Sequence, residues 1–380
     1  MNHNASPQIP ADLLPESGNF GCGPAKIRPE QIENLYQQGK NLLGTSHRQA
    51  PIKNLVAKIQ AGLTELYGLP DGYEVVLGNG GSTVFWDTAT FSLVTNKASH
   101  GSFGEFGNKF AQATNSAPFL AESNIHKAVP GTIALPDFAP DVDFYAWPQN
   151  ETSTGAIAPV KRIVGSQEAG ALTAIDATSA AGGVTVDISE TDVYYFAPQK
   201  AFSSDGGLWL AILSPDAIAR TSKIVGSGRW IPQSLSLDVA ITNSRANQTL
   251  NTPAIATLIL LADQIEWLLA NGGLSWASQR SATSAQHLYD WASNSTFASP
   301  FVANPSERST VVATIDFTDD IDATQITKVL RANKVVDVEP YRKLGRNQIR
   351  VGVFPSVEPS DVQKLIASIE YLIANGVGKN

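Results

Sequence analysis

The sequence predicts an α/β protein in which helices cover a mainly parallel sheet. Helical and strand-like patterns alternate between about residues 50 and 250, as they do when helices connect parallel strands. Two strand-like runs are also followed by residues typical of the loops at the end of a strand. The run 73–77 leads into a glycine turn, and the run 171–175 ends in Asp176. The chain has 380 residues, which is enough for two domains.

The N-terminal part of the chain supplies the elements of the sheet. Apolar residues recur with a helical period over 52–67, and a strand is expected directly after it, at 73–77. A second helix is expected over 82–94, on the far side of the glycine turn. Further strands are expected near 172–175, 193–196 and 208–213.

The C-terminal part predicts a smaller α/β domain. Helices are expected over 253–271 and 274–293, and the second of them carries the chain into that domain. In the final helix, Pro359 in the first turn and Gly376 just past the end fit the usual asymmetry of helix termini. The other elements of the small domain are expected to be a strand over 310–317, a helix over 322–332 and a strand over 348–353.

We therefore divide the chain into an N-terminal segment 1–18, a large domain 19–272 and a small C-terminal domain 273–380. Residues 1–17 have neither a basic start nor an apolar stretch, so they predict a flexible or draped terminus without a signal peptide. The most apolar segment, 254–261, meets Asp263 and Glu266 before it could span a bilayer. We expect a soluble, cytoplasmic protein.

Composition limits the classes of partner. The net charge of −8, without a basic block, argues against nucleic acid or an anionic membrane surface. An anionic substrate would have to be attracted by local arginines against this overall charge. The one cysteine, Cys22, excludes an intrachain disulfide and suits a reducing compartment. No metal site is expected.

Lys200 and Asp176 are the strongest candidates for chemistry. Lys200 lies on a short loop after the strand-like run 193–196, and Asp176 ends the earlier run 171–175. A lysine and a carboxylate placed in this way suit a pyridoxal 5′-phosphate (PLP) enzyme, in which the lysine holds the cofactor aldehyde as a Schiff base and the aspartate keeps the pyridine nitrogen protonated. Taken alone, each residue is better explained by the plainer alternative, a solvated loop lysine and a strand-end aspartate that makes a turn.

Further motifs accompany this pair in a specific order. They are Gly80-Gly81-Ser82-Thr83, Asn150-Glu151-Thr152-Ser153-Thr154-Gly155 and Ala197-Pro198-Gln199-Lys200. The ordered set resembles the class-V aminotransferases of PLP fold type I. Phe20–Ala25 and Ser46-His47-Arg48 make the chain similar to the phosphoserine aminotransferase family within that class. The resemblance runs from about Asn19 to the last helix.

The resemblance implies a fold, an activity and an assembly. The fold is a large domain with a mainly parallel seven-stranded sheet covered by helices, plus a smaller α/β C-terminal domain. The activity is amino transfer between L-glutamate and 3-phosphohydroxypyruvate, with Lys200 as the catalytic lysine. It belongs to L-serine biosynthesis, and pyridoxine biosynthesis would add 4-phosphohydroxy-L-threonine. The assembly is a homodimer with shared active sites.

The glycine turn is the expected cradle of the cofactor phosphate. Ser82 and Thr83 would offer hydroxyls and backbone N–H groups at a helix N-terminus, where negative charge is favoured. The plainer alternative is that Ser82 is only the N-cap of the helix. Many family members have an arginine in this cradle and this chain does not, so the phosphate charge must be met by other groups. Gln199 is expected to be one of them.

The resemblance assigns two further contacts to the cofactor and leaves a rival for each. Phe103 matches the position whose aromatic ring stacks on the pyridine ring, and Phe106 is its rival within the same segment. Thr152 matches the residue whose hydroxyl bonds the phenolic oxygen, and Thr154 could replace it if the loop is shifted.

Two motifs are expected to act across a dimer interface. Asn251 and Thr252 match the pair that reaches the PLP phosphate of the neighbouring subunit, although Asn-Thr-Pro is also an ordinary helix cap. His47 and Arg48 match the pair that meets the substrate phosphate, or the side-chain carboxylate of glutamate, from the other subunit.

Arginines are expected to select the substrate. Arg350 matches the family arginine that grips the α-carboxylate, and its planar fork suits two parallel hydrogen bonds. Arg342 or Arg346 is expected to complete the phosphate pocket, with Arg342 favoured, although a solvated surface loop also explains both.

Three other functions were weighed. An alanine–glyoxylate or serine–pyruvate aminotransferase shares the cofactor motifs, but its substrates have no distal anion to engage His47 and Arg48. A cysteine desulfurase needs a mobile nucleophilic cysteine, and Cys22 lies too near the N-terminus. A catalytically silent binding protein of this fold is disfavoured because Lys200 and Asp176 are both present.

Overall fold

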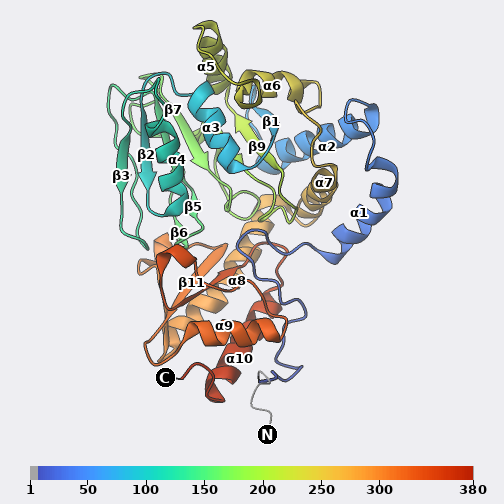
Figure 1. The fold of residues 1–380 in the computed structure, drawn as a ribbon, viewed down its shortest axis with the longest axis vertical. Helices are drawn as coiled ribbons and strands as arrows, with labels where there is room; N and C mark the ends of the chain where they lie inside the picture. Colours follow the sequence, from blue (N-terminus) through green and yellow to red (C-terminus); the bar gives the residue numbers. More distant parts are fainter. Residues whose placement is uncertain (1–6, 380) are drawn as a thin grey trace.

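A central sheet of seven strands organises the computed structural model, which describes residues 7–379 (Figure 1). Its strands are β1 (Glu74–Asn79), β2 (Ala98–Ser102), β3 (Asn124–Lys127), β4 (Phe144–Pro148), β7 (Leu172–Asp176), β8 (Val193–Phe196) and β9 (Leu208–Leu213). Their order is β1-β9-β8-β7-β4-β2-β3. β9 runs antiparallel to both neighbours, and the remaining pairs are parallel. The predicted α/β fold with a mainly parallel seven-stranded sheet is confirmed.

Helices cover both faces of this sheet because each strand sends alternate side chains to opposite sides. In β8, Tyr194 and Phe196 join an apolar core with residues of α2 and α7, whereas Val193 and Tyr195 join a second core with residues of α3 to α6. The helices are α1 (Pro29–Leu42), α2 (Ala50–Tyr67), α3 (Ser82–Ser92), α4 (Glu105–Asn115), α5 (Pro215–Gly226), α6 (Leu237–Arg245) and α7 (Ile255–Ala270).

The C-terminal third has a core of its own, below the large sheet in the view of Figure 1. Its elements are α8 (Gly273–Asn294), β10 (Ala298–Pro300), β11 (Val312–Phe317), α9 (Ala323–Ala332), β12 (Gln348–Gly352) and α10 (Pro359–Ala374). The three strands form an antiparallel sheet in the order β10-β11-β12. The predicted helices and strands of this region are present.

The N-terminal segment lies along this C-terminal part. Ile9 and Phe20 are buried in its core, and the Ile9 backbone N–H donates to Asn333 Oδ1 at 3.0 Å. Farther on, the Glu16 backbone N–H donates to Asp361 Oδ1 at 2.8 Å. Part of the terminus predicted to be flexible or draped, residues 1–6, lies outside the described residues. The division of the chain after residues 18 and 272 stays a prediction.

Short elements complete the described chain. A two-stranded ribbon of β5 (Asn150–Glu151) and β6 (Ala156–Ile157) follows β4 directly. Single 3₁₀ turns are η1 (Ile188–Glu190), η2 (Gln233–Leu235), η3 (Pro305–Glu307) and η4 (Arg342–Leu344). Within residues 7–379, no single helix is both long and apolar enough to cross a membrane; only α7 and α8 together pass that test, as a pair bent by 90°.

Candidate active site

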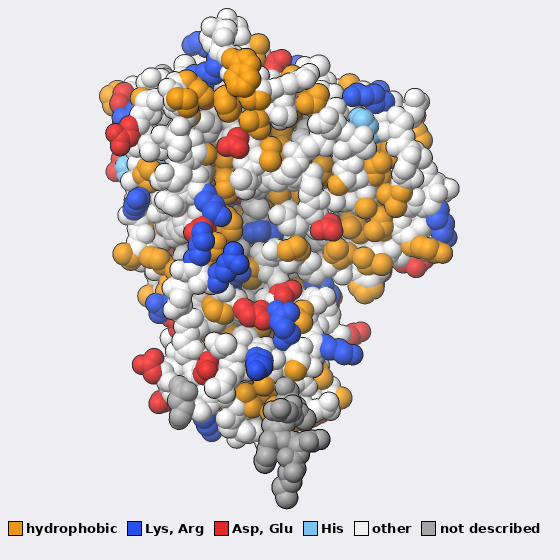
Figure 2. Space-filling view, viewed as in Figure 1, with side chains coloured by type: hydrophobic (Ala, Val, Ile, Leu, Met, Phe, Trp, Pro, Cys, Tyr) orange, Lys and Arg blue, Asp and Glu red, His pale blue; other side chains and the backbone are white. Residues whose placement is uncertain are grey.

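A cavity of about 430 Å³ lies at the carboxyl edge of the large sheet. Loops that follow β1, β4, β7 and β8 all reach it, because the carboxyl ends of parallel strands meet at one edge. Figure 2 shows Lys and Arg side chains gathered near the junction of the upper and lower parts of the molecule. Among the predicted site residues, those that line the cavity are Ser82, Thr83, Thr152, Asp176, Gln199, Lys200 and Arg350.

Lys200 is buried in this cavity, with 7% of its surface exposed. Its Nζ donates a hydrogen bond to Thr152 Oγ1 at 2.7 Å. Burial lowers the pKa of Lys200 to about 8, although the charge of Asp176 opposes this shift. Lys200 therefore loses its proton at lower pH than an ordinary lysine, which favours the neutral form that a nucleophile or a base needs.

The backbone approaches Lys200 closely at Gly23. This glycine has φ +127°, and a Cβ built on it would lie 2.7 Å from Lys200 Cε. Any larger residue would displace the lysine side chain. Cys22, the preceding residue, also lines the cavity, and burial raises the pKa of its thiol. In the sequence this segment stands out as a motif, but nothing in it predicts contact with the site.

Asp176 ends β7 and turns its carboxylate into the same cavity. Its Oδ1 accepts a hydrogen bond from the Thr178 backbone N–H at 2.9 Å, and its Oδ2 accepts a longer one from Trp86 Nε1 at 3.4 Å. The carboxylate is buried and still has acceptor capacity, so it can receive a proton-bearing nitrogen of a ligand. The pair Lys200 and Asp176 therefore shares one cavity.

The glycine turn leads into α3 as expected, but Ser82 is not its N-cap. Gly81 occupies the N-cap position, and no side chain of residues 7–379 caps the helix. The Ser82 hydroxyl instead lies 2.6 Å from that of Thr178. The N–H groups of the first turn thus remain available for an anion in the cavity. Gln199 lines the same cavity, and its buried Oε1 has no hydrogen-bond partner among residues 7–379.

The structure distinguishes the two phenylalanines and favours Phe106 over Phe103 as the ring beside Lys200. Phe103 is fully buried in the apolar core and lies outside the lining of the cavity. Phe106, in the first turn of α4, lines the cavity, and its ring centroid is 5.4 Å from Lys200 Nζ. α4 begins at Glu105, two residues after Phe103, and its first turn brings the later ring to the cavity.

Thr152 and Thr154 are also distinguished. Thr152 lines the cavity and accepts the bond from Lys200. Thr154 is fully buried, and its carbonyl oxygen accepts a hydrogen bond from Thr314 Oγ1 at 2.9 Å. Thr154 therefore ties the loop to the C-terminal sheet and offers nothing to the cavity.

Arg350 reaches the cavity from β12. Its Nη1 donates to the Thr152 carbonyl oxygen at 3.0 Å, and its buried Nε has no partner within the described chain. The guanidinium lies 5.3 Å from the ring centroid of Tyr341, which also lines the cavity and which the sequence analysis did not single out. An unsatisfied guanidinium N–H beside Lys200 suits a carboxylate ligand.

The two other arginines of this region differ in their partners. Arg346 pairs with Asp316 at 2.5 Å and lies 4.6 Å from the ring centroid of Phe301. Arg342 is exposed on η4, and no hydrogen bond or ion pair engages it among residues 7–379. Of the two, Arg342 is the one free to meet a ligand.

His47, Arg48, Asn251 and Thr252 lie together, and none of them belongs to the lining of the cavity in residues 7–379. Thr252 Oγ1 is 3.1 Å from His47 Nδ1, and Arg48 Nη1 donates to Gln248 Oε1 at 2.7 Å. Burial, and then the charge of Arg48, lower the pKa of His47. We call these four residues the outer cluster. A single copy of the chain does not bring them to Lys200.

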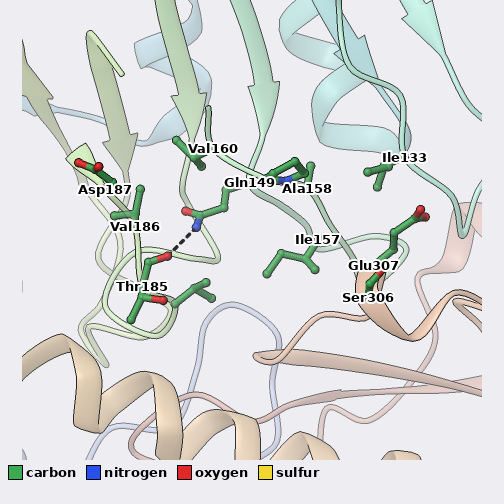
Figure 3. A pocket seen from close by; sticks show the side chains of 12 residues that line it. Ile133, Gln149, Ile157, Ala158, Val160, Thr185, Val186, Asp187, Ser306 and Glu307 are labelled. Carbon is green, nitrogen blue, oxygen red and sulfur yellow. Dashed lines mark hydrogen bonds between the residues drawn. The ribbon is translucent and has the colours of Figure 1, made fainter. Parts of the chain in front are cut away.

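A second cavity, of about 730 Å³, adjoins the loop that follows β4 (Figure 3). Gln149 lines it while the next residue, Asn150, lines the cavity with Lys200. The walls of this larger cavity, within the described part of the chain, include Asp187 and Glu307 but no lysine, arginine or predicted site residue. Its volume exceeds that of the first cavity, but its lining offers no group for amine or carbonyl chemistry.

Comparisons of the sequence and the fold with known proteins point to one family. Residues 133–338 match the family model described as aminotransferase class-V. A relative from Mycolicibacterium vanbaalenii, provisionally named a phosphoserine aminotransferase, is 60% identical over 96% of this chain and 98% of its own. The phosphoserine aminotransferase of Rhodococcus opacus is 55% identical over 97% of this chain and 99% of its own. In fold, the chain is similar to the crystal structure of a phosphoserine aminotransferase from Cytophaga hutchinsonii, with a TM-score of 0.85 and 22% identity over 94% and 99% of the two chains.

Proposed function

Since this chain belongs to the class-V aminotransferases, and among them to the phosphoserine aminotransferases, we propose that Lys200 binds PLP covalently in the cavity described above. The enzyme transfers an amino group between L-glutamate and 3-phosphohydroxypyruvate, giving 2-oxoglutarate and O-phospho-L-serine. The observation that carries the site assignment is the 2.7 Å hydrogen bond from Lys200 to Thr152, in the cavity that also contains Asp176.

The residues present fit this cofactor. Asp176 has a buried carboxylate with free acceptor capacity, which suits the protonated pyridine nitrogen. The uncapped first turn of α3 suits the phosphate. Gly23 has no side chain and so leaves room for that of Lys200, which a larger residue at position 23 would displace. We assign Phe106 to stack on the face of the PLP pyridine ring and Thr152 to form a hydrogen bond with the phenolic oxygen of PLP. When bound, the cofactor supplies an electron-poor ring that stabilises negative charge at the substrate Cα.

The residues around the cofactor divide the work of the reaction. The neutral amine of Lys200 takes the proton from the substrate Cα and later returns a proton, which its lowered pKa makes feasible near neutral pH. Asp176 stabilises the protonated ring nitrogen. Arg350 binds the α-carboxylate that all the amino and keto acids share, with the Nε–H that the described chain leaves unpaired as one donor.

The distal phosphate, or the side-chain carboxylate of glutamate, is assigned to Arg342 and to the outer cluster of a second copy of the chain. The outer cluster lies outside the cavity of its own chain, and we assign it to the site of another copy. We therefore propose a homodimer with two shared sites. Asn251 and Thr252 would complete the phosphate cradle there, which compensates for the arginine missing from the glycine turn.

We further propose that the enzyme acts in the cytoplasm, in L-serine biosynthesis. The single cysteine suits a reducing compartment, and L-serine is one reaction away from O-phospho-L-serine by loss of the phosphate. A second proposed substrate is 4-phosphohydroxy-L-threonine, of pyridoxine biosynthesis, whose phosphate the same distal anion site would accept.

Two measurements test this proposal. Borohydride reduction of the purified protein should add the mass of reduced PLP to the peptide containing Lys200, and the Lys200→Ala variant should gain no such mass. A screen of amino donors should then favour O-phospho-L-serine over serine, alanine and aspartate. Wild-type protein that takes up no PLP would exclude the aminotransferase mechanism, and equal rates with alanine would exclude the phosphoserine assignment.

A further inference from the structure

Glu151 is a fully buried carboxylate one residue before Thr152. No lysine or arginine forms a salt bridge with it in residues 7–379, and its direct polar partners there are hydrogen-bond donors. Its Oε2 accepts from the backbone N–H groups of Phe106 and Gly107, each at 3.0 Å. Its Oε1 accepts from Ser153, from the backbone N–H at 3.1 Å and from the hydroxyl at 2.6 Å.

The geometry suits an ionised carboxylate. Three of the four partners are backbone N–H groups, which can only donate, and the fourth is the Ser153 hydroxyl, whose oxygen accepts from the Glu105 backbone N–H at 3.0 Å and whose proton can be donated to Glu151. A protonated carboxyl would place a fifth hydrogen among these four. Burial raises the pKa of Glu151, whereas the hydrogen bonds from Ser153 and Gly107 lower it. The amino end of α4 adds a favourable dipole.

Glu151 takes the place of an N-cap for α4. The residue at the N-cap position, Gly104, has no side chain to offer, and a Cβ built on it would lie 2.3 Å from Glu151 Cγ. The missing side chain of Gly104 therefore leaves the space that Glu151 fills. Together, Glu151 and Ser153 bind the N–H groups of Glu105, Phe106 and Gly107, which begin the helix.

The same carboxylate thus connects two groups that meet at Lys200. Phe106 presents its ring 5.4 Å from Lys200 Nζ, and Thr152 accepts a hydrogen bond from that nitrogen. The two residues come from separate elements, α4 and the β5–β6 turn, and Glu151 bonds to the first while it forms part of the second. A shift of α4 relative to this turn would change the width of the cavity at Lys200.

We propose that Glu151 is a positioning residue, which orients the Phe106 ring against the Thr152 side of the cavity and so sets its fit to the cofactor. This inference rests on the proposed function for the identity of the cofactor. A purely structural role would lower stability without changing how the folded protein binds PLP, and the two roles are therefore separable by experiment.

The test compares Glu151→Gln with a matched control, Asp322→Asn. Asp322 also caps a helix, α9, by accepting from the Thr324 and Gln325 backbone N–H groups, but it lies outside the lining of the cavity. In Glu151→Gln an amide NH₂ faces N–H donors, so we expect the dissociation constant for PLP to rise roughly ten- to hundredfold in protein that remains folded. The control should lower Tm and leave PLP binding within about twofold of wild type.

A double-mutant cycle asks whether Glu151 acts through Phe106. In the Phe106→Ala background, Glu151→Gln should change PLP affinity by less than about threefold, because the ring that it orients is gone. Equal fold-changes in both backgrounds would overturn the proposal. If Glu151→Gln does not fold, Ser153→Ala, which removes one donor to the carboxylate, serves in the same cycle and should show the same coupling with a smaller effect.

Hydrogen exchange of the cofactor-free protein gives a readout that does not depend on PLP. The amides of Phe106 and Gly107 should exchange faster in Glu151→Gln than in wild type and should be unchanged in Asp322→Asn. Unchanged exchange in folded Glu151→Gln would overturn the positioning role. Wild-type protein without PLP uptake would overturn the proposed function instead, while the exchange data would still decide whether Glu151 holds the start of α4.

Discussion

The hydroxyl of Thr252 lies 3.1 Å from Nδ1 of His47, although 205 residues separate them in the chain. Both residues were assigned, from different motifs, to the active site of a second subunit. Their contact places the two motifs on one surface, where Arg48 also bonds to Gln248 and to the Leu250 carbonyl oxygen. His47 Nε2 is buried and has no hydrogen-bond partner among residues 7–379.

A hybrid dimer should recover activity that neither parent has. Chains with Lys200→Ala lack the reactive amine, and chains with Arg48→Ala lack one member of the outer cluster. Co-expression of the two with different tags should give a hybrid in which one site contains both Lys200 and Arg48. Since a two-fold interface pairs the same surfaces on both chains, that hybrid should show about half of wild-type activity per dimer.

The measurement is the rate with O-phospho-L-serine in hybrids purified through both tags. Arg245→Ala serves as the control for a lost surface arginine, because Arg245 pairs with Glu74 on the exposed surface and lies outside both the cavity and the outer cluster. A hybrid of that variant with wild type should keep full activity. Hybrids of Lys200→Ala and Arg48→Ala that are no more active than the parents would show that the sites are not shared.

Phe106→Ala and Phe103→Ala should have opposite consequences. Phe103 is buried in the apolar core, so its truncation should lower the free energy of unfolding by about 3–5 kcal/mol. Phe106 is only partly buried and lines the cavity, so its truncation should weaken PLP binding with a smaller loss of stability. Denaturant unfolding and spectroscopic PLP titration measure the two effects. The reverse pattern would restore Phe103 as the ring-stacking residue.

Lys200→Met should stabilise the cofactor-free protein, and the gain should depend on pH. The pKa of Lys200 is lowered from 10.5 in the unfolded reference to about 8, so below pH 8 the folded state carries a buried charge at a cost. We expect Lys200→Met to raise the free energy of unfolding at pH 7 by roughly 2–3 kcal/mol. Between pH 8 and 10.5 the folded wild type binds fewer protons than the unfolded chain, so wild-type stability rises and the difference shrinks.

Urea unfolding at several pH values between 7 and 11 checks this prediction. Lys58→Met is the control, because Lys58 is exposed and pairs with the exposed Glu266, so the substitution should change stability by no more than about 0.5 kcal/mol. A Lys200→Met variant without extra stability at pH 7, or with a gain that stays constant up to pH 11, would contradict the lowered pKa.

Arg342→Ala should affect the substrate phosphate, and Arg346→Ala should not. Arg346 is engaged by Asp316 and stacks over Phe301, so its loss should lower stability and leave KM for O-phospho-L-serine nearly unchanged. Arg342 has no such partner among the described residues, and its loss should raise that KM about tenfold or more while the KM for alanine stays the same. Equal effects of the two variants on the phosphorylated substrate would contradict the assignment.

The position of Lys200 and Asp176 could be anticipated from the sequence because it follows from strand order. Each residue follows a buried strand-like run, and β7 and β8 are parallel neighbours in the sheet. Parallel neighbours present their carboxyl ends at the same edge, so the two side chains had to lie close. The identity of the cofactor was predicted from the family motifs, because no strand pattern specifies a cofactor.

The choice between neighbouring residues could not be made in this way. Phe103 and Phe106 stand three positions apart, and either ring could face the cavity until the start of α4 is known. That start depends on Glu151, which is far away in the sequence and was noted only as the middle residue of Asn-Glu-Thr. A buried carboxylate with only backbone and hydroxyl partners leaves no signal in composition or spacing.

The sequence by itself determined the fold class, the family and the cavity-lining pair Lys200 and Asp176, because strand periodicity and local motifs are properties of short segments. Only the tertiary structure decided that Phe106 faces the lysine, that Arg346 is occupied by Asp316 and that the outer cluster lies outside the cavity of its own chain. Each of these depends on contacts between segments distant in the chain. Such contacts are set by packing and by the hydrogen bonds that buried polar groups require.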